Sequence, residues 1–316
     1  MEIDRIYNCD CLEGMKLIPD GSVDCIICDL PYGTMKTAWK GLDEFDDRHS
    51  WDDIIPTDKL FAAYDRVLRK NGVAVLFSQE PYTTHLRGYN RKSNIRFCYP
   101  MMWKKNTFGM PLNAKHAPVS FFEDISVFVK PYDSNGTNSM RDYFKGILTY
   151  IGLTKKEIMQ AVGERADHVL RVDSTQWALC TAETYNEFIR LYHIDQMQGF
   201  RSYEDLQKED EAFKAKYSRV FNLPEDKAYL GNVLEFPKES QRFHPTQKPV
   251  ELIAQLVRTF SNPGDTILDN TIGSGTTAVA ALREKRHFIG FELNKDYYEK
   301  ACKRIKAEQS QLKLQL

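Results

Sequence analysis

No stretch of this sequence approaches the roughly 20 consecutive apolar residues that a membrane-spanning helix needs. Residues 1–4 lack the basic and apolar regions that open a secretory signal. The 7 cysteines are odd in number and scattered, so they do not suggest the disulfide framework of a small secreted domain. The sequence therefore predicts a cytoplasmic protein with reduced thiols and no membrane partner. Its 316 residues suffice for one large core and a smaller module.

Acidic residues are absent between Pro81 and Phe122, although the whole chain has a formal net charge of only −1. Aromatic side chains are interleaved there with basic ones. Such a single-signed segment predicts a surface that faces the phosphates of a nucleic acid. The alternative is a solvated loop whose acidic partners lie nearby only in space. The basic residues concerned are Arg87, Arg91, Lys92, Arg96, Lys104, Lys105 and Lys115.

Two pairs of closely spaced cysteines could be scored as a zinc site by their spacing alone. Cys9 and Cys11 form one pair, and the other, Cys25 and Cys28, falls in an apolar run typical of a buried parallel strand. Residues three apart in a strand point to opposite faces, whereas a zinc knuckle needs both sulfurs on one side. We therefore expect buried thiols and no metal ligands.

The three-glycine fingerprint of dinucleotide-binding proteins is incomplete. A strand, an Ala-rich helix and a second strand follow one another in 266–291, and Glu292 ends the last strand. The first turn holds Gly273 and Gly275 but no third glycine. This βαβ pattern indicates a nucleotide site whose terminal acid binds ribose hydroxyls, and the missing glycine argues against NAD or FAD. A single nucleoside without a pyrophosphate fits better, as in S-adenosylmethionine.

The apolar run 23–28 ends in the tetrapeptide Asp29-Leu30-Pro31-Tyr32. Ligands of open α/β sheets bind just beyond the carboxyl ends of the strands, so this tetrapeptide is placed for a site. Asp29 and a backbone carbonyl can accept both hydrogens of an amino group on a planar base, while Tyr32 stacks on its ring. A lone match of four residues would be an ordinary turn, so the assignment depends on the rest of the chain.

Four elements together resemble the permuted, or beta-group, S-adenosylmethionine-dependent DNA amino-methyltransferases of phages and bacteria. In that family the catalytic tetrapeptide precedes the cofactor glycines. Residues 29–32 resemble the catalytic Asp-Pro-Pro-Tyr, with leucine in place of the first proline. Residues 269–277 resemble the glycine loop, with asparagine in place of its usual proline. The other two elements are the acidic segment 8–12 and the segment 244–249.

The resemblance implies a set of site residues. Asp10 would contact the cofactor adenine, Glu292 its ribose, and the segment 244–249 its methionine part. The catalytic residues are Asp29, Leu30, Pro31 and Tyr32. The cofactor-binding residues are Asp10, Cys11, Asp29, His244, Thr246, Gln247, Lys248, Asp269, Asn270, Thr271, Gly273, Ser274, Gly275, Thr276, Glu292 and Leu293.

The resemblance also implies the reaction. A target base is flipped out of duplex DNA against Tyr32, and Asp29 helps to aim its amine at the methyl group of S-adenosylmethionine. Adenine N6 is the expected acceptor, because the cytosine enzymes of the family usually carry serine where Asp29 stands. Methylation of cytosine N4, methylation of RNA adenine and an inert DNA-binding relic are the alternatives. A homodimer and a cognate restriction endonuclease stay open as partners.

The expected fold is α/β, a Rossmann-like methyltransferase sheet with helices on both faces and a mainly helical insert. We place the catalytic half at 1–132, the insert at 133–229 and the cofactor half at 230–316. A turn-rich linker at 131–138 marks the first boundary. Further predicted elements are a strand and helix in 4–18, a helix at 56–68, an Asn-Gly turn at 71–72, strands at 72–77 and 125–130, the βαβ elements 266–269, 276–284 and 287–291, and a final helix at 295–309.

The insert is interpreted as a target-recognition module. Residues 154–157 form a capping-box pattern that opens a short helix ended by Gly163. A second helix carries bulky side chains on one face in 185–192. The polar segment between them, 165–177, suggests a helix-turn-helix-like reader of the major groove. Its candidate base contacts are Arg171, Ser174 and Gln176. A helical lid or a dimer-contact domain is the alternative.

Overall fold

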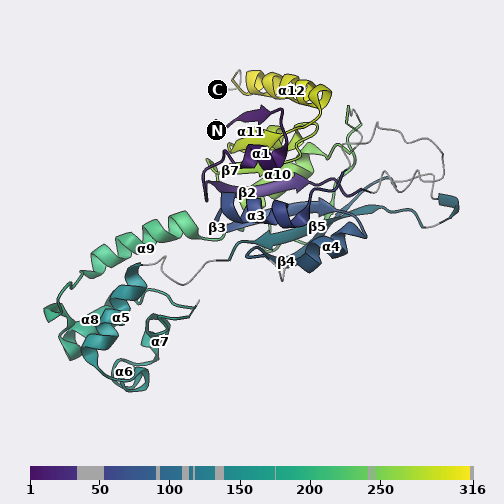
Figure 1. Cartoon of the computed structure of the whole chain (residues 1–316). Helices are drawn as coiled ribbons and strands as arrows, with labels where there is room; N and C mark the ends of the chain where they lie inside the picture. The colour runs from purple at the N-terminus through teal and green to yellow at the C-terminus, as the bar shows by residue number, and fades with distance from the viewer. Residues whose placement is uncertain are drawn as a thin grey trace. The chain divides into compact units, whose positions relative to one another are not determined.

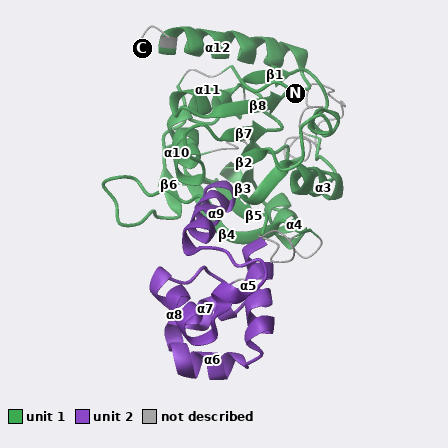
Figure 2. Ribbon diagram, turned by 90° about the vertical axis from the view of Figure 1, so that its left-hand side faces the viewer, with its two compact units in different colours: residues 1–131, 219–316 green, residues 132–218 purple. Residues whose placement is uncertain are grey.

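The computed structural model describes residues 1–33, 53–89, 93–108, 114–116, 118–131, 139–174, 176–240, 243–244 and 246–313. The chain forms two compact units, one of residues 1–131 with 219–316 and one of residues 132–218 (Figure 2). The insert therefore ends at Ser218, earlier than the expected boundary at 229. The amide of Asn222 gives the reason, because it donates to the carbonyls of Arg258 and Ser261, both at 3.0 Å, and so fastens this segment to the first unit.

One eight-stranded sheet forms the centre of the first unit (Figure 1), and its strands follow the order β1-β8-β7-β2-β3-β5-β4-β6 (Figure 2). Neighbours from β1 to β3 are parallel, β5 is antiparallel to both β3 and β4, and β6 pairs in parallel with β4. The strands are β1 (Arg5–Tyr7), β2 (Val23–Asp29), β3 (Leu68–Ser78), β4 (Arg96–Lys104), β5 (Phe122–Val129), β6 (Val233–Glu235), β7 (Thr266–Asp269) and β8 (His287–Phe291).

Helices cover both faces of this sheet, which confirms the predicted fold class. On one face α10, α11 and α12 pack against the strand side chains, among them Cys25 and Ile27. On the other face α1, α3 and α4 pack against Ile26 and Cys28. The two cysteines are thus buried on opposite faces, as predicted, and β2 is buried on both, as is usual for a central parallel strand. The helices are α1 (Cys11–Met15), α3 (Thr57–Val67), α4 (Tyr82–Gly88), α10 (Val250–Phe260), α11 (Thr276–Arg283) and α12 (Lys295–Lys313).

The βαβ unit forms as predicted, with β7 and β8 at the expected bounds and α11 beginning at Thr276. The Asn-Gly turn is wrong, because β3 follows α3 directly and runs through Asn71, whose φ is 59°. The register of β2 against β3 shifts between Val23 and Cys25. The residues around Asn71 therefore form an irregularity inside the strand, where an extra length of chain is absorbed without a turn.

The second unit is helical, and its core is built from aromatic and aliphatic side chains. The capping box is confirmed, since Thr154 and Glu157 each accept a backbone N–H of the other. Tyr185 and Phe188 are buried on the predicted face of the second helix. The helices are α5 (Ser139–Ile151), α6 (Lys155–Val162), α7 (Asp167–Leu170), α8 (Ala182–Tyr192) and α9 (Tyr203–Tyr217).

The helix-turn-helix expectation is wrong in one respect. After α6 the chain forms a single 3₁₀ turn, Glu164–Ala166, and then α7, which has 4 residues. A helix of one turn is too short to lie along a major groove as a recognition helix. Any base contacts from 165–177 would therefore come from a compact turn structure. Over the described parts of both units, none of the helices is long and apolar enough to cross a membrane.

Candidate active site

A cavity of about 590 Å³ lies at the carboxyl ends of β2, β7 and β8. From β2 the sheet extends through β3 in one direction, and from β7 it extends through β8 in the other. This boundary is a topological switch point, the place where open α/β sheets bind ligands. Every residue that the sequence assigns to catalysis or to the cofactor lines this cavity except Gly275.

The tetrapeptide predicted to be catalytic begins at Asp29, the last residue of β2. Asp29 Oδ1 accepts a hydrogen bond from the Tyr32 hydroxyl at 3.0 Å, and the Asp29 side chain is 20% exposed. Leu30 packs into the core on the α1 and α3 side of the sheet, so it anchors the turn. The strand thus presents one carboxylate and one aromatic ring at the cavity.

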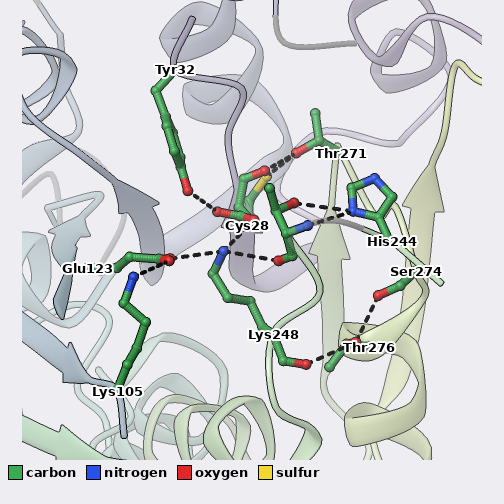
Figure 3. Close-up of polar contacts among 11 residues, drawn as sticks. Cys28, Tyr32, Lys105, Glu123, His244, Lys248, Thr271, Ser274 and Thr276 are labelled. Carbon is green, nitrogen blue, oxygen red and sulfur yellow. Dashed lines mark hydrogen bonds and ion pairs between the residues drawn. The ribbon is translucent and has the colours of Figure 1, made fainter. Parts of the chain in front are cut away.

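The loop after β7 is fastened to β2. Thr271 Oγ1 donates to the backbone carbonyl of Asp29 at 2.8 Å and lies 2.9 Å from Cys28 Sγ (Figure 3). Asn270 is buried, and its side-chain oxygen accepts a hydrogen bond from the Tyr64 hydroxyl of α3 at 2.5 Å. Cys11 Sγ accepts from the Asn270 amide at 3.7 Å. Side-chain hydrogen bonds therefore hold the loop at the position where the family usually has a proline ring.

Two glycines give this loop its shape. Gly273 and Gly275 have φ values of 49° and 76°, a region that favours glycine. The Gly273 N–H donates to Glu292 Oε2 at 2.9 Å, and a Cβ at Gly273 would lie 3.4 Å from the His244 ring. Gly275 precedes the first turn of α11. The loop backbone thus lies within van der Waals reach of the His244 ring, and the positive φ disfavours a side chain at Gly273.

The two carboxylates expected to hold the nucleoside also hold the backbone. Asp10 caps α1, since its Oδ1 accepts the N–H groups of Leu12 at 2.9 Å and Glu13 at 3.1 Å. Glu292 Oε1 accepts the N–H of Asn294 at 2.8 Å, in addition to the bond from the glycine loop. Burial raises the pKa of the Glu292 carboxyl. Each acid therefore combines structural support with a place on the cavity wall, and the neighbouring Leu293 is 68% exposed there.

His244 contributes a neutral ring to the opposite side of the glycine loop. It is buried, its ring centroid lies 4.3 Å from that of Tyr297, and its Nδ1 accepts the Thr246 N–H at 3.3 Å. Burial, aided by the Lys248 ammonium, lowers the pKa of His244 to about 4. Gln247 is buried beside it. The segment from His244 to Gln247 is thus uncharged, and Lys248 is the first charged residue after it.

Lys248 was expected at the cofactor, but its ammonium group lies against the catalytic strand. Its Nζ is 2.5 Å from Asp29 Oδ2 and 3.0 Å from Glu123 Oε2 (Figure 3). Lys105 Nζ lies 3.0 Å from the other oxygen of Glu123. Lys105 is only 2% exposed, so its assignment to a phosphate-facing surface is wrong.

Glu123 was not predicted as a site residue. Site residues were sought at the carboxyl ends of strands, whereas Glu123 lies at the beginning of β5. β5 runs antiparallel to β3, so the beginning of β5 shares an edge with the carboxyl ends of the parallel strands. The sequence did contain one signal for Glu123, the alternation of inward-facing and outward-facing residues along a strand. Glu123 lies two and four residues before Ile125 and Val127, which are buried on one face. The same period connects Trp103 of β4 to Lys105, the residue that follows this strand.

The other cations of the acid-free segment divide into three groups. Arg87 pairs with Asp124 at 3.2 Å and Lys104 with Glu235 at 2.9 Å, as the solvated-loop alternative anticipated. Arg96 and Lys115 are exposed. Arg91 and Lys92 lie outside the described residues. The phosphate-facing surface, if built from this segment, is therefore smaller than the sequence suggested.

The three candidate base contacts in the second unit lie together. Arg171 donates hydrogen bonds to Asp167 and to the side-chain oxygen of Gln176. The Ser174 hydroxyl accepts the backbone N–H of Gln176 at 3.1 Å. These side chains thus form one polar cluster after α7, in which the Arg171 guanidinium is already partly engaged.

The order of these parts along the chain is permuted, since the Asp29 strand comes early and the glycine loop late. On a sheet of this topology, that order characterises Rossmann-like methyltransferases that act on amino groups of DNA bases. A family model described as DNA methylase matches residues 23–303, and the chain belongs to this family. It is thus an enzyme of the DNA methyltransferase class.

Individual relatives support this assignment. The chain is 27% identical to the DNA adenine methyltransferase YhdJ of Escherichia coli strain K12, over 96% of this chain and 83% of that protein. Its fold is similar to that of M1.HpyAVI in a complex with SAM, with a TM-score of 0.53 and 21% identity over 95% of this chain and 98% of that one. It is also similar to the cytosine-N4-specific PvuII DNA methyltransferase, with a TM-score of 0.50 and 12% identity over 94% and 84% of the two chains. At these identities the structural likeness concerns the fold alone.

Proposed function

We propose that the protein transfers the methyl group of S-adenosylmethionine to the exocyclic N6 amine of adenine in double-stranded DNA. The observation that carries the proposal is the position of Asp29 and Tyr32 at the same cavity as the glycine loop and Glu292. A carboxylate at that point accepts one hydrogen of an amine and thereby helps to aim the nitrogen lone pair. A bacterial or phage DNA substrate places the reaction in the cytoplasm.

The cavity fits the cofactor. Its volume of about 590 Å³ lies in the range of small-molecule sites. Asp10 would accept the adenine amine, Glu292 the ribose hydroxyls, and the neutral segment from His244 to Gln247 would face the methionine part. When bound, S-adenosylmethionine supplies an already activated methyl group, so the chain contributes alignment and electrostatics.

The base site is formed by the tetrapeptide. Tyr32 stacks on the ring of the flipped base, an interaction worth roughly 1–3 kcal/mol. Asp29 accepts one amine hydrogen and the backbone carbonyl at Leu30 accepts the other, which draws the nitrogen lone pair out of conjugation with the ring. The reaction then needs no metal ion.

Adenine is favoured over cytosine by two observations. The position of Asp29 carries serine in most cytosine enzymes of the family, and the relative that covers 96% of this chain is named an adenine methyltransferase. Cytosine N4 is the second candidate, because the same hydrogen-bond acceptors suit its amine. RNA is the third, since a flipped or unpaired adenine is the same chemical acceptor in either nucleic acid.

A single assay separates these candidates. The purified protein is incubated with tritiated S-adenosylmethionine and with unmethylated DNA, RNA or neither, and the products are digested to nucleosides and separated. We expect label in N6-methyladenine from DNA only, and no label with Asp29→Ala, whose affinity for the cofactor alone should stay within several-fold. Label in N4-methylcytosine would overturn the choice of base, and full activity of Asp29→Ala would overturn the role of the tetrapeptide.

A further inference from the structure

Four charged side chains form a continuous buried chain at the catalytic edge of the sheet. Lys105, Glu123 and Lys248 follow one another at separations of 3.0 and 3.0 Å (Figure 3), and Asp29 lies 2.5 Å beyond Lys248. Their side chains are 2%, 11%, 5% and 20% exposed. Buried charges are costly even when paired, so a structural purpose would be served better by apolar side chains. Such an arrangement points to a functional role.

Asp29 is the end of this chain that meets the cavity. Both of its oxygens are engaged, Oδ1 by the Tyr32 hydroxyl at 3.0 Å and Oδ2 by Lys248. An incoming amine must therefore share or replace one of these partners. Lys248 has a second carboxylate in Glu123, so its ammonium group stays paired when Asp29 turns to the amine. The rings of Phe77 and Trp103, 5.2 and 5.9 Å from Nζ, flank the ammonium.

We propose that Lys248 is a positioning residue that keeps Asp29 ionised and oriented until the target amine enters, and that Glu123 keeps the Lys248 ammonium group in place. This inference rests on the proposed function. In the reaction the carbon–sulfur bond breaks with its electrons going to sulfur, a nitrogen–carbon bond forms, and the methylated nitrogen releases a proton to water. An ionised Asp29 accepts the amine hydrogen and stabilises the positive charge that develops on nitrogen. A protonated Asp29 would keep only a weaker, uncharged acceptor and could not offset that positive charge.

The charges around Asp29 act in opposite directions. Burial raises the pKa of the Asp29 carboxyl, the Lys248 ammonium opposes this rise, and the Glu123 carboxylate adds to it. Burial alone would also raise the pKa of Glu123, but Lys248 and Lys105 more than offset that effect and lower it. Burial lowers the pKa of Lys248, and its two carboxylate partners outweigh this and raise it. The titratable groups that face Asp29 are Lys248, Glu123, Tyr32, Cys28 and Asp269.

Two substitutions should therefore move the pH profile of methyl transfer in opposite directions. Lys248→Met removes the positive charge, so the acid limb of the rate should move to higher pH, by roughly 1–3 units. Glu123→Gln removes the negative charge, so the acid limb should move to lower pH. Lys248→Arg keeps the charge and should restore most of the wild-type profile. A loss of folding or packing would not produce shifts of opposite sign.

The control variant is Lys130→Met. Lys130 is also a partly buried lysine with an acidic partner, Asp65 at 3.6 Å, but it lies at the opposite end of β5. Its acid limb should coincide with that of the wild type. The Kd for S-adenosylmethionine without DNA should stay within about twofold in the Lys248 variants, because their target is Asp29. A loss of affinity that matches the loss of rate would instead make Lys248 a cofactor ligand.

A second readout does not depend on any substrate. The Asp29 carboxyl carbon is followed by carbon-13 NMR as a function of pH in the full-length wild type, Lys248→Met and Glu123→Gln, with Asp29→Asn to assign the signal. The apparent pKa of Asp29 should rise in the first variant and fall in the second. Unchanged titration in both would overturn the inference. If these shifts appear and the wild type methylates no DNA, the proposed function fails and the role of Lys248 toward Asp29 stands.

Discussion

Replacing Asp10 by asparagine separates the two tasks that the structure gives to this carboxylate. Asp10 Oδ1 caps α1 by accepting two backbone N–H groups. The residue also lines the cavity, where we place the adenine of S-adenosylmethionine. Asparagine caps helices about as well as aspartate does, so Asp10→Asn should leave the free energy of unfolding within about 0.3 kcal/mol of the wild type.

The cofactor affinity should respond much more strongly. The oxygen of the new side-chain amide would stay with the two N–H groups, which turns the amide nitrogen toward the adenine amine and sets a donor against a donor. A hydrogen bond to a charged acceptor contributes about 1.5–3 kcal/mol, so the Kd should rise roughly ten- to a hundredfold. Asp10→Ala should lose this affinity and also about 0.5–2 kcal/mol of stability, because the cap is lost as well.

Calorimetric titration with S-adenosylmethionine in the absence of DNA, together with urea unfolding, measures both quantities. Ser202→Ala is the matched control, since Ser202 caps α9 by accepting the Asp205 N–H at 3.2 Å and does not line the cavity. It should lower stability and leave the Kd unchanged. If Asp10→Asn binds the cofactor as tightly as the wild type, Asp10 is only a helix cap and the adenine must be held elsewhere.

Other contacts lead to three more expected outcomes. Tyr64→Phe leaves the buried side-chain oxygen of Asn270 without its donor, so the free energy of unfolding in urea should fall by about 1–3 kcal/mol. The pKa of His244, lowered by burial to about 4 from 6.5, means that its contribution to stability is present above pH 6.5 and is lost as the pH falls toward 4. His244→Gln should therefore remove on the order of 3 kcal/mol of the stability change across that window, and an unchanged slope would contradict the assignment. Arg96→Glu should weaken binding to every duplex and reduce the salt slope by about 0.9 for each lost phosphate contact, whereas Gln176→Ala should change which sites are methylated, at roughly 1–3 kcal/mol of discrimination. If methylation sequencing showed changed sites for Arg96→Glu and only weaker binding for Gln176→Ala, Arg96 would read the bases and Gln176 would contact the phosphates.

The cofactor half of the fold was predictable because each of its elements has a local signal. β7 and β8 are short apolar runs, the loop between β7 and α11 carries two glycines, and Glu292 follows its strand directly. The same rule, that a polar residue after a buried parallel strand faces the ligand edge, identified Asp29. Local pattern and final position agree here because parallel strands all end at the same edge.

The features that were not predicted depend on residues that are neighbours in the fold but distant in the sequence. β4 was taken for part of a basic surface, although the alternation that runs from β4 into Lys105, the next residue, places Trp103 and Lys105 inside and Lys104 outside. Glu123 became an active-site neighbour only through the antiparallel pairing of β5 with β3. The Asn-Gly pair at 71–72 suggested a turn, but tertiary pairing with β5 kept this stretch in the sheet, with the Asn71 N–H donating to the Lys130 carbonyl at 2.9 Å.

The same pairings bear on how an enzyme with a formal net charge of −1 meets DNA. Of the cations in the acid-free segment, Arg87, Lys104 and Lys105 already have acidic partners. At most four are left for phosphates, two of them outside the described residues, which corresponds to a salt slope of no more than about −4 from this surface. If a DNA phosphate displaced the acidic partner of one of these three cations, the ion pair lost would offset the ion pair gained. We expect the remaining affinity to come from other parts of the chain, among them Tyr32 through the flipped base and the second unit. An enzyme built in this way would bind random DNA weakly and would gain most of its affinity at the site that it methylates.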